Sequence, residues 1–197
     1  MIVHQVEQGS PEWHEVRRGV PSASNFKNIL TARGKPSQAS RKYALQLARE
    51  QLFGLEESTP VNLDMQRGRD LEAEAVRSYE FERNQITKVI GWVTDDATTY
   101  GCSPDRMNLE VKCPRDNNHT KWSEKGCVPS EHFCQVQGCM WVCEEDYWDF
   151  FSYSKTLESF WVRAYRDEQW ISAMEKQMAL FLEQKSEFLE LLKEEAA

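Results

Sequence analysis

The chain has 197 residues, of which 40% are hydrophobic and 28% are charged, and its formal net charge is −8. This length and composition are typical of one compact domain with its own core. No run of about 18 apolar residues is present, and the N-terminus lacks the basic start and apolar block of a signal peptide. We therefore expect no membrane span and place the protein in the cytoplasm.

The charge is unevenly distributed along the chain. Residues 1–49 contain eight Lys or Arg against three Glu, whereas residues 157–197 contain five basic against nine acidic side chains. A basic N-terminal third opposite an acidic C-terminal part lets one face meet a polyanion despite the negative total. Two ordinary solvated surfaces would have the same composition.

In a cytoplasmic chain, cysteines are more often buried thiols or metal ligands than disulfides. No CxxC pair is present, which weakens a zinc site, and the spacing differs from known iron–sulfur runs. The six cysteines are Cys102, Cys113, Cys127, Cys134, Cys139 and Cys143.

Helical signals dominate the first 83 residues. Ser10 and Pro11 predict an N-cap and first helical turn over residues 10–16. A second helix is expected from about residue 22 to residue 30, followed by a loop over residues 31–40. Residues 41–53 predict a third helix, residues 54–64 a connection, and residues 65–83 a long helix whose buried face recurs every four residues.

The second half mixes strands with helices. Residues 88–95, 98–104 and 107–113 are short, β-rich and separated by turn residues, which predicts three antiparallel strands. Residues 130–143 predict a helix, residues 147–154 and 159–166 a hairpin of aromatic strands, and residues 167–195 a final amphipathic helix. The expected fold is α/β (α+β), with a mixed central sheet flanked by helices. One domain would contain N-terminal helices (10–53), a core (65–165) and the C-terminal helix (167–195).

The most informative stretch lies between residues 103 and 114. Asp105 ends one expected strand, and Glu110 and Lys112 follow a tight turn with one residue between them, so both project to the same face. Two carboxylates can hold a hard cation such as Mg²⁺, which activates water and neutralises charge on a phosphate. Lys112 would stabilise the transition state or position the water, and the carbonyl of Val111 is a further candidate ligand.

The D-x4-E-x-K pattern is short, and solvent-facing hairpin residues would look the same. Its neighbours Cys102, Leu109, Val111 and Cys113 indicate buried strands, however, and charges that face inward from buried strands need partners. The pattern therefore favours metal-dependent phosphodiester cleavage.

Further candidates come from two helices. Glu72 lies beside the apolar Leu71 and can supply a third carboxylate, although an exposed acidic helix face is an equal alternative. Gln135 and Gln137 stand in an otherwise apolar helix, so each must be paired in the core or reach the site.

Five blocks, in order, resemble the phage lambda exonuclease-like (YqaJ-type) viral recombinase nucleases of the PD-(D/E)xK superfamily. Together they cover roughly residues 5–145. The blocks are Glu12–Val20, Ser22–Ser24, Gly68–Glu72, Ser103–Pro114, and Gln135–Gln137 with Met140–Val142.

The resemblance implies a restriction-endonuclease-like core and a role for each matching residue. Glu72, Asp105 and Glu110 would bind two Mg²⁺ ions, with Mn²⁺ as a substitute. Lys112 would be the catalytic lysine, and Gln135 would orient the nucleophile or the terminal nucleotide.

The resemblance also assigns a pocket for the end of the digested strand. Arg17, Ser24 and Ser103 would bind its 5′-phosphate, and an Arg fork beside two hydroxyls suits this ligand. A surface pair between Arg17 and a neighbouring acid such as Glu15 or Glu12 is the alternative. Arg106 departs from the family, in which Gly usually follows the catalytic Asp.

The implied function is a 5′→3′ exonuclease of phage-type recombination that acts on double-stranded DNA ends. It would release 5′-mononucleotides and leave a 3′ overhang for a single-strand annealing protein. The implied assembly is a toroidal homotrimer, encoded by a phage or prophage and present in the bacterial cytoplasm. A Cas4-like or restriction-like nuclease and an inactive DNA-binding recombination module are the alternatives.

Overall fold

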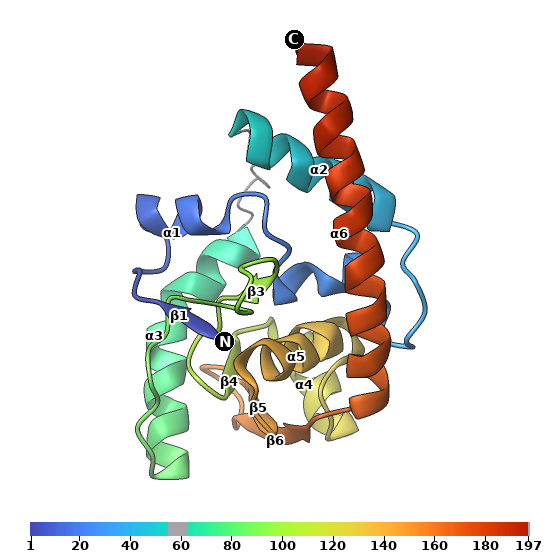
Figure 1. The fold of residues 1–197 in the computed structure, drawn as a ribbon. Helices are drawn as coiled ribbons and strands as arrows, with labels where there is room; N and C mark the ends of the chain where they lie inside the picture. The colour runs from blue at the N-terminus through green and yellow to red at the C-terminus, as the bar shows by residue number, and fades with distance from the viewer. Residues whose placement is uncertain (55–62, 197) are drawn as a thin grey trace.

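The computed structural model describes residues 1–54 and 63–196. Most of the predicted connection over residues 54–64 lies outside these residues. The helices are α1 (Pro11–Arg17), the 3-10 helix η1 (Ala23–Asn28), α2 (Ser40–Phe53), α3 (Leu63–Arg83), α4 (Asp116–Lys125), α5 (Ser130–Cys143) and α6 (Glu168–Ala196). The strands are β1 (Ile2–His4), β2 (Trp92–Thr94), β3 (Gly101–Cys102), β4 (Leu109–Lys112), β5 (Tyr147–Ser152) and β6 (Phe160–Tyr165) (Figure 1).

The strands form two three-stranded sheets rather than one central sheet. Strands β1, β2 and β3 form an antiparallel sheet, whereas β4 pairs parallel with β5, which pairs antiparallel with β6. The expected meander of three antiparallel strands over residues 88–113 is therefore wrong for its third strand. Parallel pairing needs a long crossover, and α4 and α5 provide it between β4 and β5.

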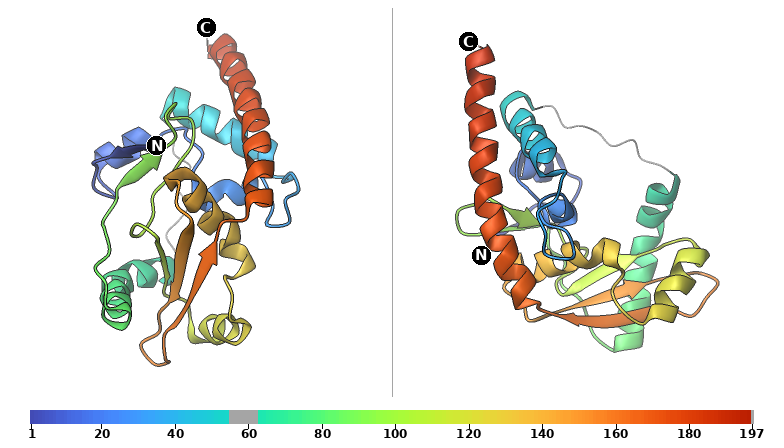
Figure 2. Two further views of the ribbon diagram at one scale, coloured as in Figure 1. Left: turned by 60° about the horizontal axis from the view of Figure 1, so that its bottom comes forward. Right: turned by 90° about the vertical axis from the view of Figure 1, so that its right-hand side faces the viewer.

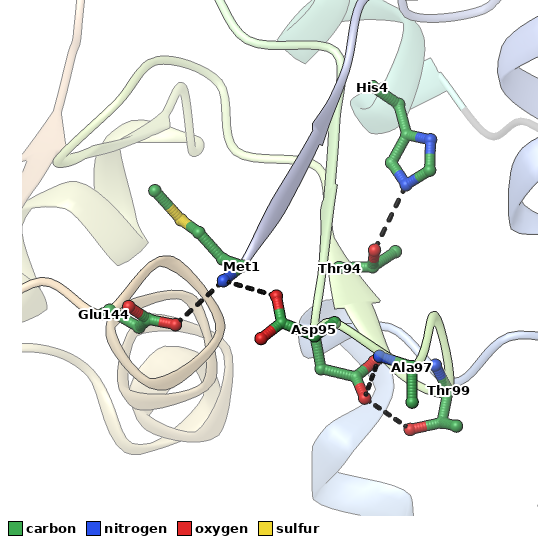
Figure 3. A network of polar contacts seen from close by, with 8 residues as sticks. Met1, His4, Thr94, Asp95, Ala97, Thr99 and Glu144 are labelled. Atoms are coloured by element: carbon green, nitrogen blue, oxygen red, sulfur yellow. Dashed lines mark hydrogen bonds and ion pairs between the residues drawn. The ribbon is translucent and has the colours of Figure 1, made fainter.

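Three further elements differ from the expectation. The second helix is the short 3-10 helix η1, and both β1 and α4 were not predicted. In β1 the pairing with β2 compensates for its short length. The amino group of Met1 forms ion pairs with Asp96 (2.9 Å) and Glu144 (3.0 Å), and His4 bonds to Thr94 (Figure 3). In α4 only two side chains are buried, which is too few to give a helical period.

Helix α5 lies at the centre of the larger core. All its residues from Val136 to Cys143 are buried, and it contacts η1, β3 and β5. A side chain at Gly138 would meet the ring of Phe26 at 2.5 Å, so this glycine allows η1 to approach α5 closely.

The two longest helices, α3 and α6, were predicted to within two residues at each end. Helix α6 lies along α2, and its far end projects from the body of the molecule (Figures 1 and 2). The amphipathic character predicted for it is seen in the burial of Trp170, Met174, Met178 and Phe181. Within the two described ranges, no helix is both long and apolar enough to cross a membrane.

Helix α3 is fixed against the second sheet by a buried polar network. The hydroxyl of Tyr79 donates to Asp149 (2.5 Å), and Arg163 donates to both oxygens of the same carboxylate (2.7 and 2.9 Å). Asp149 is fully buried on β5, so this network sets the position of α3 relative to β4 and β5.

Candidate active site

A pocket of about 580 Å³ opens where the first turns of α3 face the end of β4 and helices α4 and α5. Asp105, Val111 and Lys112 line it from β4 and the turn before β4, and Glu72 lines it from α3. Segments that are 30 or more residues apart in the sequence thus place two carboxylates and an ammonium in one cavity.

The turn before β4 brings Asp105 back to its own strand. Asn108 has a φ of 60°, and Arg106 and Leu109 form an isolated bridge across the turn. Asn has a short polar side chain that tolerates this left-handed conformation. The carboxylate of Asp105 can therefore accept a hydrogen bond from the backbone N–H of Val111 (2.7 Å).

Glu110 is fully buried beneath this pocket. Its Oε1 accepts a hydrogen bond from the ammonium of Lys112, whose side chain is 27% exposed. Its Oε2 is buried and has no hydrogen-bond partner among the described residues. A buried carboxylate oxygen without a partner is costly, and a bound cation would remove that cost.

The carboxylates also act on one another electrostatically. Burial raises the pKa of Glu110, and Asp105 and Glu72 raise it further, while Lys112 acts in the opposite direction. Burial and the charge of Asp105 likewise raise the pKa of Glu72. Each of these carboxylates thus disfavours the charged form of its neighbours, and a cation bound between them would relieve that repulsion.

The donor set fits a hard divalent cation such as Mg²⁺. Carboxylate and carbonyl oxygens are its preferred ligands, and Glu72, Asp105, Glu110 and the carbonyl of Val111 are available. In the part of the chain that the structure describes, no three His, Cys, Asp or Glu side chains converge closely enough to enclose an ion as they stand.

A second pocket of about 460 Å³ contains Arg17. The guanidinium of Arg17 stacks on the ring of Trp13, 3.7 Å from its centroid, and guanidinium groups are the side chains best suited to bind a phosphate. Trp13 is held in turn by Ser103, whose Oγ accepts from the indole N–H (2.9 Å) and donates to the carbonyl of Gly91 (2.5 Å).

The other two predicted site residues, Ser24 and Gln135, are not among the described residues that line these cavities. Ser24 is exposed and shares a hydrogen bond with Ser22 (3.1 Å), which lines the second pocket. Gln135 is half-buried on α5 and is not among the described residues that line either pocket. Its neighbour Gln137 is a satisfied core amide that donates to the carbonyl of Tyr165 (2.9 Å) and accepts from the N–H of Asp167 (2.8 Å).

Among the residues that line the first pocket and that sequence reasoning missed are Arg67, Arg69 and His132. Burial, and then the charge of Lys112, lower the pKa of His132 to about 4, so its imidazole is neutral at physiological pH. The two arginines flank Gly68 one turn before Glu72, and this spacing on a helix was a usable signal.

The six cysteines are free thiols. Cys102 and Cys143 are buried with their sulfurs 3.5 Å apart, whereas Cys127 is exposed. A four-cysteine cluster needs four converging thiolates, and the described residues contain no such group.

Comparison with known proteins shows a family and a shared fold. Residues 12–146 match the YqaJ-like viral recombinase domain. The crystal structure of an alkaline exonuclease (LHK-Exo) from Laribacter hongkongensis is similar, with a TM-score of 0.85 and 28% identity over 95% of this chain and 98% of that chain. The complex of LHK-Exo with dAMP has a TM-score of 0.83, 28% identity and the same coverage.

A more distant match shows the fold alone. It is a phage-related exonuclease from Haemophilus somnus 129PT, with a TM-score of 0.64 and 16% identity over 93% of this chain and 99% of that chain. No curated protein sequence matches. Because the matched segment spans more than half of the chain and includes both pockets' principal side chains, the chain belongs to the family of YqaJ-like viral recombinase domains.

Proposed function

We propose that this protein is a metal-dependent exonuclease that digests one strand of duplex DNA from its 5′ end. It releases 5′-mononucleotides and leaves a 3′ overhang. The observation that carries the proposal is the ion pair between the buried Glu110 and Lys112, which lines the same pocket as Asp105 and Glu72. The similarity to an alkaline exonuclease, one structure of which contains dAMP, supports this reading.

The residues of the first pocket have different roles in the proposed reaction. Glu72, Asp105, Glu110 and the carbonyl of Val111 hold Mg²⁺, which supplies water activation and neutralises charge on the phosphate. Lys112 donates to a phosphate oxygen as negative charge develops there, while its contact with Glu110 keeps the ammonium in place. The hydrogen bond from Val111 keeps the Asp105 carboxylate turned toward the pocket. Gln135 orients the attacking water or the terminal nucleotide.

The second pocket selects the end of the strand. The guanidinium of Arg17, fixed in plane by Trp13, binds the terminal 5′-phosphate. Ser103 acts by holding Trp13, and Ser24 adds a hydroxyl at the rim. A terminal phosphate carries about one more negative charge than a phosphodiester. The pocket therefore favours a phosphorylated end over an internal linkage.

The family supports the remaining parts of the proposal. The whole chain acts as one nuclease domain and assembles as a homotrimer around double-stranded DNA ends. A single-strand annealing protein receives the overhang, and the gene belongs to a phage or prophage expressed in the bacterial cytoplasm. Mass measurement in solution, with and without DNA, tests the trimer directly.

The activity is tested on linear duplex DNA in Mg²⁺, with one strand carrying a 5′-phosphate and the other a 5′-hydroxyl. We expect loss of the phosphorylated strand from its 5′ end, release of mononucleotides, and no activity in Lys112→Ala or on closed circles. Cleavage of circles would indicate a restriction-like endonuclease. Binding of ends without any cleavage would indicate an inactive recombination module.

A further inference from the structure

The two pockets of the site meet at one side chain. Among the residues that the structure describes, Arg69 is the one that lines both the Glu72–Asp105–Lys112 pocket and the Arg17 pocket. We propose that Arg69 binds the scissile phosphodiester, the second phosphate from the 5′ end, and so positions it one nucleotide from the terminal phosphate. This inference rests on the proposed exonuclease function.

The charge of Arg69 is available for a ligand. Its side chain is exposed, and within the described residues it forms no hydrogen bond or salt bridge. The neighbouring arginine is used differently, since Arg67 donates to the carbonyl of Cys113 (2.9 Å). Arg69 is therefore an uncommitted guanidinium at the junction of two cavities, and guanidinium groups bind phosphates through paired N–H donors.

Its surroundings place it close to the carboxylates. Arg69 and Glu72 are three residues apart on α3, which makes them neighbours on the helix surface, and both line the first pocket. A guanidinium near Glu72 on one side and in the Arg17 pocket on the other lies on the path between the two phosphates of the terminal nucleotide. The phosphate beside Glu72 is the one that is cleaved.

Gly68 provides a second, independent observation. It lines the first pocket within helix α3, where glycine is unfavourable, and a Cβ built there would meet nothing within 4 Å. No packing neighbour explains a glycine at this position. The missing side chain leaves the wall next to Arg69 open, so that a sugar–phosphate backbone can pass close to the helix.

The proposal can be tested by binding, without cleavage, in the Lys112→Ala background. A 5′-phosphorylated duplex is compared with duplexes that carry a neutral methylphosphonate at the second or the third phosphate, and with a 5′-hydroxyl duplex. Dissociation constants are measured for the background protein and for added Arg69→Ala, Arg17→Ala and Arg77→Ala. Arg77 is an exposed arginine on the same helix and serves as the matched control.

We expect Arg69→Ala to weaken binding of the unmodified duplex by about tenfold or more, in line with the loss of a charge-assisted contact. In the background protein, which keeps Arg69, a methylphosphonate at the second phosphate should weaken binding by a similar factor. In Arg69→Ala the same modification should change the affinity little. Arg17→Ala should instead remove the preference for the 5′-phosphate. Arg77→Ala should change neither the affinity for the unmodified duplex nor this preference. Arg69→Lys should retain part of the affinity because it keeps the charge.

A second variant separates a structural role from a binding role. Gly68→Ala should raise the thermal midpoint, because alanine favours the helix, and yet weaken binding of the unmodified duplex. Two results would overturn the proposal. One is that Arg69→Ala removes the effect of modifying the terminal or the third phosphate instead of the second. The other is that Arg69→Ala binds the unmodified duplex as well as Arg77→Ala does. Because this assay measures binding, a wild-type protein that does not digest DNA would refute the proposed function separately.

Discussion

The ammonium of Lys112 donates a hydrogen bond to Oε1 of Glu110, a side chain with 0% exposure, while Oε2 of the same carboxylate has no partner among the described residues. One oxygen is thus satisfied by the protein and the other is not. The same pair therefore matters for both stability and chemistry, because a partner that binds Oε2 of Glu110 would also lie beside the pocket.

Removal of one partner of this pair should affect folding as well as catalysis. We expect Lys112→Ala to lower activity by about 10³-fold and the free energy of unfolding by about 1–3 kcal/mol, since Glu110 is left buried without its cation. The double variant Glu110→Gln/Lys112→Met should regain the stability and remain inactive. Urea unfolding and nucleotide release measure the two effects, and a double variant as unstable as Lys112→Ala would contradict this account.

Chelation and metal addition should act on stability too. A cation that binds only the folded state raises the free energy of unfolding by mass action, so we expect Mg²⁺ to raise the thermal midpoint and EDTA to abolish cleavage until Mg²⁺ or Mn²⁺ is restored. Asp105→Asn should remove most of the Mg²⁺-dependent increase. The control is Asp70→Asn, an exposed carboxylate on α3 that accepts from Gln66 and should leave the increase intact.

The Asp149 network should be a structural determinant of the site. Asp149→Ala leaves Arg163 without its bidentate partner, and we expect a loss of about 2–3 kcal/mol because Arg163 is 32% exposed and keeps some solvent. Tyr79→Phe removes one hydrogen bond and should cost about 1 kcal/mol. Both variants should lower activity by displacing α3 and thereby Glu72. The hydroxyl of Tyr153 donates to the part-exposed Glu74. Tyr153→Phe is the control and should lower the free energy of unfolding, measured in urea, by less than Tyr79→Phe does.

Thiol reactivity should report which cysteines are accessible. Burial raises the pKa of Cys134 to about 11 and that of Cys102 well above its ordinary value, whereas Cys127 is exposed. We expect Ellman's reagent at pH 8 to label one thiol quickly, and Cys127→Ala to remove this phase. Rapid labelling of several thiols in the folded protein would show that the interior around α5 opens to solvent.

Local periodicity was sufficient for much of this protein. The apolar spacing of α2, α3, α5 and α6 and the aromatic runs of β5 and β6 are properties of neighbouring residues, so they predicted these elements with nearly the correct bounds. The spacing of Glu110 and Lys112 likewise placed both on one strand, and the motif order correctly indicated the family.

Long-range pairing was decided only in the folded chain. Strand β4 is buried over Leu109–Val111 and pairs with β5 across a crossover of more than 30 residues, and a local pattern cannot distinguish this from a meander. The same holds for Ser103, which holds Trp13, and for Arg69, which joins two cavities. Sequence alone determined which side chains were available for chemistry. The tertiary structure decided which of them meet, because contacts between distant segments depend on packing that no local period records.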